Sequence, residues 1–489
     1  MPIPIFRFTF YTLLVLLLSA CTVGPDYQRS TTLADADASN NNSYHHTNTP
    51  GIGDKPEPYV ATAWWQRIDD ALLKTWVDQL LAQNLNLQAT AERVIQAQEQ
   101  VRITGGDLWP NAAFSGGGSR GFSPAPLASD TPEYSSATNT GLTLSWQIDL
   151  FGKVRQAVAS ANYSALASAE DHRALQHSLI AELVKRRAEI ALLQQELDIQ
   201  DEIVSSRTQT LSTLSRRYQL GVRGVSVVDI YTAEENVASA SANRSALEQQ
   251  LHNTFLTVDA LLNQLPGSAS KTMTTLSWRS FPILSNIAPP APGFPAALLD
   301  QRPDIRGDEL LARAANANIG VAVANLLPDL TLSASRGFVN NQFGGLLDNN
   351  NALGSITGLI TSRLFEGGRL KAGVRLRESE ARERALRYAE TVLNALVEVE
   401  NALVNERYLR EQVAHLERSV SFSRRAETQA QQRYQRGITP LLQLLDAQRR
   451  RQSVEQNLLA ARRAAWRARV DLHLALGGDW LDSQAHGNS

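Results

Sequence analysis

The residues that could bind a metal ion, hold a phosphate or attack a substrate do not fall into the spacings that this chemistry needs. His45 and His46 stand in a polar stretch, while His172 and His177 are spaced i,i+5, which does not place both on one helix face. No carboxylate or cysteine cluster joins either pair. Glycines 116–118 lack the Lys-Ser/Thr of a phosphate loop, and no Ser, His and Asp combine in a nucleophile motif. The sequence therefore predicts no metal, no cofactor and no enzyme.

One residue does have a chemical task. Cys21 is the only cysteine of the chain, so an intrachain disulfide is excluded. It follows a leader with Arg7, an apolar run at 11–18 and two small residues, which is the pattern of a secretory signal. Residues 18–21 resemble a bacterial lipobox, in which the cysteine carries acyl chains that bind the membrane; the alternative is a chance cysteine in an apolar leader. Thr22, in place of Asp, favours the outer membrane by the same resemblance.

The composition limits the kinds of partner that the chain can bind and the way in which it could cross a membrane. A formal net charge of -2 over 489 residues argues against nucleic acid, which needs a basic surface. The run of three arginines at 449–451 indicates a solvated or interhelical face instead. After residue 20 no stretch is apolar for the roughly 20 residues that a transmembrane helix needs. Any membrane crossing must then use strands. Residues 22–62 are polar, rich in Asn, Ser, Thr and Asp, and indicate an irregular tail.

Two very long helices are predicted from the placement of proline and glycine. Residues 153–217 contain neither, and residues 369–433 contain only Gly373. Both runs are dense in good helix formers, and at 1.5 Å per residue each makes a helix of roughly 100 Å. Shorter runs follow at 226–265 and 441–476, and each ends in a stop signal, Pro-Gly at 266–267 and Gly-Gly at 477–478.

The matching run lengths indicate an internal duplication. Similar short motifs recur at a nearly constant separation, in the pairs 108–111 and 326–329, 150–153 and 364–367, 217–221 and 433–437, and Ala233 and Ala447. Each copy is predicted to consist of a helix, a strand, a loop, a strand, a very long helix, a tight turn and a shorter helix.

The strands are the candidates for crossing a membrane. Leu142, Leu144 and Trp146 alternate with polar residues over 142–150, the period-2 pattern of a half-buried strand. A transmembrane strand needs about 9–11 such residues. A small soluble sheet with one wet face is the alternative. Strands in a bilayer require a closed barrel, and single-chain barrels begin at about eight strands. Four strands per chain therefore imply that several chains share one barrel.

At this point the residues resemble a known family, the TolC-like outer-membrane factors of tripartite efflux systems, in their lipoprotein branch often labelled NodT. The resemblance covers nearly the whole chain. It is carried by motifs at 21–27, 64–65, 146–152, 292–295, 302–305, 314–320 and 474–478, and by the two Arg-Tyr-x-x-Gly turns at 217–221 and 433–437.

The resemblance implies an α+β membrane protein: a homotrimer whose 12-stranded outer-membrane β-barrel, with four strands per chain, continues as a long periplasmic α-helical barrel. The expected organisation is a signal peptide at 1–20, a lipid anchor and tail at 21–66, a first repeat at 67–265, an equatorial segment at 266–300, a second repeat at 301–476 and a C-terminal tail at 477–489. In the first repeat the strands are expected near 111–123 and 140–150 and the hairpin at 153–265; in the second, near 329–339 and 354–365 and at 369–476.

By the same resemblance, Leu442, Asp446 and Arg449 form the periplasmic gate of the resting pore. Rings of leucine dewet a constriction and rings of carboxylates select cations. An ordinary i,i+3 pair between Asp446 and Arg449 is the alternative. Gln443 stands where some relatives carry a second Asp, which puts a double acidic ring in doubt.

A periplasmic adaptor hairpin is expected to dock at Gly221, Val222, Gly437 and Ile438. The first turn is two residues longer than the second, so the tips are not equivalent.

The expected function is a passive duct in the outer membrane of a Gram-negative cell, lipid-anchored at Cys21 and extending into the periplasm. It would conduct substrates delivered by an inner-membrane transporter and a periplasmic adaptor, a membrane fusion protein. A type I secretion exit duct and a non-pore periplasmic coiled-coil lipoprotein are the alternatives. A spacer without a pore does not need two copies of an amphipathic strand pair. The sequence leaves the cargo open among drugs, organic acids, metal ions and peptides.

Overall fold

The computed structural model describes residues 22–29, 44, 63–123, 133–222, 224–273, 281–282, 290, 298–341, 347–477 and 480. Cys21, the predicted lipidation site, lies outside these residues. The chain divides into two compact units. The sheet unit comprises Met1–Ser30, Glu92–Glu170 and Gly307–Glu390, and the hairpin unit comprises Thr31–Ala91, Asp171–Arg306 and Thr391–Ser489.

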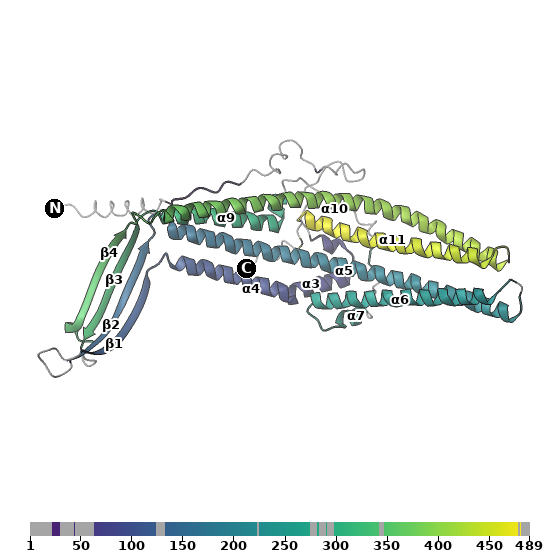
Figure 1. Cartoon of the computed structure of the whole chain (residues 1–489), viewed down its shortest axis with the longest axis horizontal. Helices are drawn as coiled ribbons and strands as arrows, with labels where there is room; N and C mark the ends of the chain where they lie inside the picture. The colour runs from purple at the N-terminus through teal and green to yellow at the C-terminus, as the bar shows by residue number, and fades with distance from the viewer. Residues whose placement is uncertain are drawn as a thin grey trace. The chain divides into compact units, whose positions relative to one another are not determined.

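The sheet unit contains four antiparallel strands in the order β1-β2-β3-β4 (Figure 1). They are β1 Asn111–Ser123, β2 Glu133–Ile148, β3 Asp329–Asn340 and β4 Ala352–Thr361. Residues of the same parity face one another across the ladder, as Ala334 does between Leu144 and Ile356. Alternation of side chains along each strand then gives the sheet two distinct faces.

One face is apolar and the other is polar. The apolar face carries large side chains from all four strands: Phe114, Leu142, Leu144, Trp146, Leu332, Ile356 and Ile360. The opposite face carries mainly small polar residues, among them Asn139, Thr143, Ser145, Gln147, Ser333, Ser335 and Thr357. On the polar face Gln147 donates to Asp329 over 2.9 Å, and the hydroxyls of Ser335 and Ser355 lie 2.9 Å apart.

The limits of β2 and β4 differ from those predicted. β2 begins at Glu133 rather than near 140, because its backbone stays paired with β1 through a run of small polar residues that shows no hydrophobic alternation. It ends at Ile148 rather than 150, because the Asp149 carboxylate turns to accept from the Arg155 N–H at 3.0 Å. β4 spans 352–361 rather than 354–365, because Thr361 already pairs with Asp329, the first residue of β3.

Six of the helices form three pairs of equal length. α5 Lys153–Gln219 and α10 Arg369–Gln435 have 67 residues each, α6 Val227–Leu261 and α11 Leu441–Ala475 have 35, and α4 Leu85–Gly106 and α9 Pro303–Ala324 have 22. The duplication in the sequence is therefore a duplication of structural elements. Among the described residues, no helix is both long enough and apolar enough to cross a bilayer.

The single helix predicted at the start of the first repeat is two helices, α3 Ala71–Gln83 and α4. Asn84 separates them. Its side chain accepts from the N–H groups of Asn86 (3.0 Å) and Leu87 (3.2 Å) and so caps α4.

α6 ends at Leu261, before the predicted Leu265, because Asn263 adopts a left-handed conformation with φ 52°. Asp259 then accepts from the N–H groups of Gly267 and Ala269, both at 2.7 Å, at the start of the short helix α7 Ser268–Met273. α8 Leu298–Gln301 lies at the other end of the segment predicted to be equatorial.

An aromatic and ionic core lies in the hairpin unit. The His473 ring stacks on Trp64 with centroids 4.0 Å apart, and Asp70 pairs with the fully buried Arg187 at 2.6 Å. Burial, together with the nearby Arg469 and Arg67, lowers the pKa of His473 to about 3. Burial also lowers the pKa of His177 to about 4. Both rings are therefore neutral in the folded protein near neutral pH.

Residues 22–29, which follow the predicted lipidation site, are seated on α9 within the sheet unit. A Cβ atom at Gly24 would lie 2.7 Å from the Cα atom of Gly320, so the two backbones touch where only glycine fits. Arg29 pairs with Glu309 of α9 at 2.6 Å. Contacts at both ends therefore fix the path of this segment.

Candidate functional site

The two long helices end in the same backbone motif. Gly221 follows α5 with φ 67° and Gly437 follows α10 with φ 72°, a conformation that favours glycine. In each turn the glycine N–H donates to a tyrosine carbonyl and the next N–H to an arginine carbonyl: Gly221 to Tyr218 (2.9 Å), Val222 to Arg217 (3.0 Å), Gly437 to Tyr434 (2.9 Å) and Ile438 to Arg433 (2.9 Å). Both turns are Schellman motifs.

Each tip presents an apolar side chain beside an open backbone. Val222 is 45% exposed and Ile438 is 60% exposed. Apart from the chain neighbours of each glycine, no heavy atom of the described residues lies within 4 Å of the position that a Cβ atom would take at Gly221 or Gly437. These four residues are the ones expected to contact an adaptor, and each tip leaves its pair open to solvent.

The return helices begin differently. Ser226 and Asp229 form a capping box at the start of α6, in which the Ser226 N–H donates to the Asp229 carboxylate at 2.7 Å. α11 begins after Pro440, and no side chain caps it. The carboxylate of Asp229, the acidic residue near the first tip, is therefore already engaged in capping α6.

The three residues expected to form the gate lie in the first turns of α11. Leu442 is 68% exposed, and Asp446 and Arg449 are exposed as well. The expected alternative, an i,i+3 pair of Asp446 with Arg449, does not form. Asp446 pairs instead with Arg450, one helical turn on, at 2.8 Å. Arg449 is left as a solvent-facing cation beside the acidic residue.

Contacts join the two hairpins behind the tips. The Arg217 guanidinium lies 5.3 Å from the centroid of the Tyr434 ring, within cation–π range. Arg207 of α5 donates to the Asn236 carbonyl of α6 and to Gln452 of α11, both at 2.7 Å. Burial lowers the pKa of Arg207, and Arg449 adds to this effect while Glu235 opposes it.

A partly buried ionic cluster in the second hairpin has no counterpart among the sequence-based predictions. Arg451 pairs with Glu427 at 2.6 Å, and Glu455 pairs with Arg424 at 2.7 Å. Burial raises the pKa of Glu427, an effect that Arg451 opposes. Of the three arginines at 449–451, Arg451 is thus the interhelical member. The missed signal is an i,i+4 Arg/Glu pair on α11 opposite an i,i+3 Arg/Glu pair on α10.

The histidines and the glycine-rich run considered in the sequence analysis have structural roles. His172 lies 2.7 Å from the Thr90 hydroxyl, and His177 stacks on Trp480. Within the described part of the chain, no three His, Cys, Asp or Glu side chains gather as metal ligands would. The letters Gly-x-Ser-x-Gly do occur at 117–121, contrary to the sequence-based expectation. They lie inside β1, so the strand-to-helix elbow of a nucleophile is absent there.

A sheet with one apolar and one polar face, on the same chain as two very long helical hairpins, defines an α+β outer-membrane channel component. The outer membrane efflux protein family matches residues 76–264 and 294–478. The chain belongs to this family, and its function is that of the outer-membrane component of an efflux system.

Individual relatives are similar along nearly their whole length. The toluene efflux pump outer membrane protein TtgC of Pseudomonas putida is 26% identical over 96% of this chain and 95% of its own. The cation efflux system protein CusC of Escherichia coli O6:H1 is 26% identical over 95% and 97%. The solved structure of the outer-membrane channel OprN is 28% identical, with a TM-score of 0.80 over 94% of this chain and all of that one.

Proposed function

We propose that three copies of this chain form a passive exit duct in the outer membrane of a Gram-negative cell. Their sheets would join into one 12-stranded barrel, and their hairpins would continue it as a helical tube in the periplasm. An inner-membrane transporter and a periplasmic adaptor would deliver the substrates. The number of chains comes from the family resemblance.

The two-faced sheet is the observation that carries the proposal. Its apolar face suits lipid and its polar face suits a water-filled lumen. In the described chain β1 and β4 each pair on one side only, so two rows of backbone groups lack a strand partner. Such edges are not tolerated against hydrocarbon. Joining copies edge to edge satisfies the backbone and turns the polar faces inward.

The lipid anchor is proposed at Cys21. The next residues support it, because 22–29 are seated on α9 through Gly24 and Gly320 in the unit that holds the sheet. Acyl chains on Cys21 would then enter the membrane at a fixed place on the sheet unit. Residues 266–300, with the chain ends, would form the equatorial belt around the tube.

The gate is proposed at Leu442, Asp446 and Arg449. In a trimer each would form a ring of three, in which leucines exclude water and carboxylates attract cations. The exposure of all three residues supports this role, because no other part of the described chain covers them. Separation of the hairpins would break the contact between Arg217 and Tyr434.

Adaptor docking is proposed at Gly221, Val222, Gly437 and Ile438. An exposed aliphatic side chain beside a bare glycine backbone lets a partner helix approach closely. The repetition of this arrangement at both tips supports two related docking positions per chain. Cargo does not follow from similarity, because relatives named for toluene and for cations are equally identical to this chain.

Single-channel recording tests the duct and its gate together. The purified full-length protein in planar bilayers should give discrete conductance steps, and Asp446→Ala or Arg449→Ala should raise the open probability. Thr232→Ala is the matched control, because Thr232 stands at the equivalent position of α6. Absence of conductance from the natural chain and from both gate variants would overturn the proposal, and chemical crosslinking of the same preparation should show trimers.

A further inference from the structure

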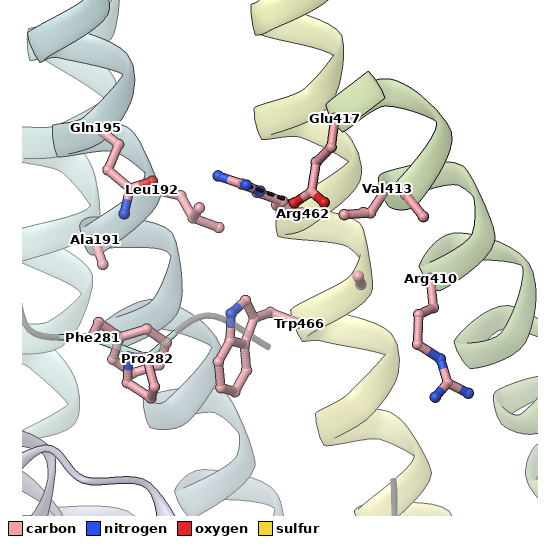
Figure 2. A pocket seen from close by; sticks show the side chains of 12 residues that line it. Ala191, Leu192, Gln195, Phe281, Pro282, Arg410, Val413, Glu417, Arg462 and Trp466 are labelled. Atoms are coloured by element: carbon pink, nitrogen blue, oxygen red, sulfur yellow. Dashed lines mark hydrogen bonds and ion pairs between the residues drawn. The ribbon is translucent and has the colours of Figure 1, made fainter. Parts of the chain in front are cut away.

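A small cavity lies in the hairpin unit, away from the tips. Its volume is about 120 Å³, and α5, α10 and α11 form its walls together with Phe281 and Pro282 (Figure 2). The cavity therefore joins elements of both repeats. Nothing in the proposed gate or docking surfaces uses it.

The floor of the cavity suits an aromatic ring. Trp466 and Phe281 are both buried, with ring centroids 4.8 Å apart and planes tilted by 52°. Leu192 and Val413 add aliphatic walls from α5 and α10 (Figure 2). Apolar cavities of about 150 Å³ bind benzene, whereas drug-sized ligands need about 300 Å³ or more. The space fits a single six-membered ring.

The rim of the cavity favours an anion. Arg462 spans it and pairs with Glu417 at 2.7 Å, and Arg410 stands on the α10 side (Figure 2). The Arg462 guanidinium meets the Glu417 carboxylate, whereas the Arg410 guanidinium points away from that carboxylate (Figure 2). The Nε atom of Arg462 is buried and has no hydrogen-bond partner among the described residues, which leaves a donor beside the cavity. Within the described chain no ion pair engages Arg410.

A larger space of about 540 Å³ adjoins the cavity, since Gln195, Glu417 and Arg462 line both. The Arg462–Glu417 pair therefore separates an apolar pocket from a more polar one. The Glu417 side chain is 42% exposed and can rotate into solvent. A ligand carboxylate could then take its place on Arg462 without leaving a buried charge unpaired.

We infer that this cavity binds a monocyclic aromatic carboxylate. The ring packs against Trp466 and Phe281, and the carboxylate accepts hydrogen bonds from Arg462. The inference does not depend on the gate or the adaptor, because it concerns a site in the wall between the hairpins.

Isothermal titration calorimetry on the full-length protein in detergent, with a micelle blank, tests the inference. The probe is benzoate, and benzamide and benzylamine are the neutral and cationic comparisons of the same size. Benzoate should bind once per chain and at least about tenfold more tightly than benzamide, which cannot form the charged hydrogen bonds. Benzoate heats equal to the micelle blank, or tighter binding of benzylamine, would overturn it.

Four variants separate a ligand role from a structural one. Arg462→Gln should weaken benzoate binding roughly tenfold or more, and Glu417→Gln should strengthen it because the competing carboxylate is gone. Ala414→Leu should weaken binding by filling part of the cavity, which Ala414 lines. Arg425→Gln, at an exposed arginine of the same helix as Glu417, is the control and should change nothing.

If the pair of Arg462 and Glu417 were purely structural, Arg462→Gln and Glu417→Gln would change the affinity for benzoate in the same direction. That result would contradict the inference. Melting curves by circular dichroism identify any variant that is misfolded. If Arg462→Gln does not fold, Glu417→Gln and Ala414→Leu decide: unchanged affinity in both rejects the site.

Discussion

Ion pairs with buried carboxylates join the two helices of the second hairpin, α10 and α11, whereas the equivalent positions of the first hairpin, α5 and α6, are uncharged. The cluster of Arg424, Glu427, Arg451 and Glu455 corresponds, counted from the helix starts, to Thr208, Leu211, Val237 and Ser241. The backbones nevertheless agree in helix length and in the glycine that ends each long helix. Both hairpins carry an ion pair between their helices in the exposed region, Asp201 with Arg244 and Glu417 with Arg462. The two hairpins therefore share a backbone and differ in the ion pairs with buried carboxylates.

This difference indicates which part of the hairpins can move at the lowest cost in free energy. The second hairpin is held together internally by ion pairs, one of which has Glu455 with a side chain only 2% exposed. Near the tips the hairpins are joined to each other by Arg207 with Gln452 and by Arg217 with Tyr434, and neither contact pairs opposite charges. Farther from the tips, ion pairs join α5 to α11: Lys185 with Asp471, Glu196 with Arg463 and Glu189 with Arg467. We expect the tip end of the second hairpin to move as a unit relative to the first.

The largest expected effect comes from removing the shared cation of the cluster. Arg451 pairs with Glu427 at 2.6 Å and also lies 3.8 Å from Glu455, whose other partner is Arg424. Arg451→Met would leave the Glu427 carboxylate without this partner and next to that of Glu455, at a cost of about 3–5 kcal/mol of stability. Val237→Met makes the same side chain at the equivalent position of α6 and should cost less than about 1.5 kcal/mol. Thermal unfolding followed by circular dichroism measures both.

A second substitution checks the cause of that loss. Adding Glu427→Gln to Arg451→Met removes one of the two facing charges and should recover part of the apparent Tm. If the double variant is less stable than Arg451→Met alone, or if Val237→Met is equally damaging, the loss is one of packing and the contrast between hairpins does not hold.

The ends of the return helices differ in their response to pH. In the second repeat His473 is buried against Trp64, with its pKa lowered to about 3; the equivalent residue of the first repeat is Asp259, which caps α7. Because the folded pKa lies below the unfolded value of about 6.5, protonation favours unfolding. The contribution of His473 to stability is complete above a pH of about 6.5 and is lost as pH falls toward the folded pKa.

His177, whose pKa is lowered to about 4, acts in the same direction. Between pH 7 and 5 the loss should be on the order of 2 kcal/mol per histidine. His473→Phe keeps an aromatic ring beside Trp64 and should make the fall of apparent Tm with pH shallower. An unchanged slope would show that His473 does not titrate on unfolding.

The sequence predicts the parts of this structure that depend on neighbours along the chain. Runs without proline or glycine give the helices, and the turn glycines Gly221 and Gly437 give the stops. The end of α6 was missed because Asn263 takes a left-handed conformation that its residue type only permits. The cluster around Arg451 was missed because its partners are on the other arm of the hairpin, and only the turn register brings them together.

A smaller effect tests the similarity of the tips. Gly221→Ala and Gly437→Ala each force an L side chain into positive φ and should cost about 1–2 kcal/mol. The two losses should agree, because both turns have the same hydrogen bonds and open space beside the glycine. Chemical denaturation of the two variants measures this. A loss at one tip alone would show that the turns are not equivalent in energy.

The smallest expected effect tests the difference between the starts of the two return helices, of which α6 has a capping box and α11 has none. Ser226→Ala removes a side chain that accepts from the Asp229 N–H and frees the Asp229 carboxylate, at a cost of about 1 kcal/mol. Pro440→Ala removes no cap, because no side-chain hydrogen bond is present there, and should change stability by less than about 0.5 kcal/mol. Pro440→Ser should instead stabilise the start of α11, since it supplies the missing acceptor.

Amide hydrogen exchange of the first turns of α6 and α11 measures the stability of each helix start separately. Faster exchange in α6 of Ser226→Ala and slower exchange in α11 of Pro440→Ser are expected, whereas equal exchange at both starts in the natural chain would mean that the capping box does not distinguish the two hairpins.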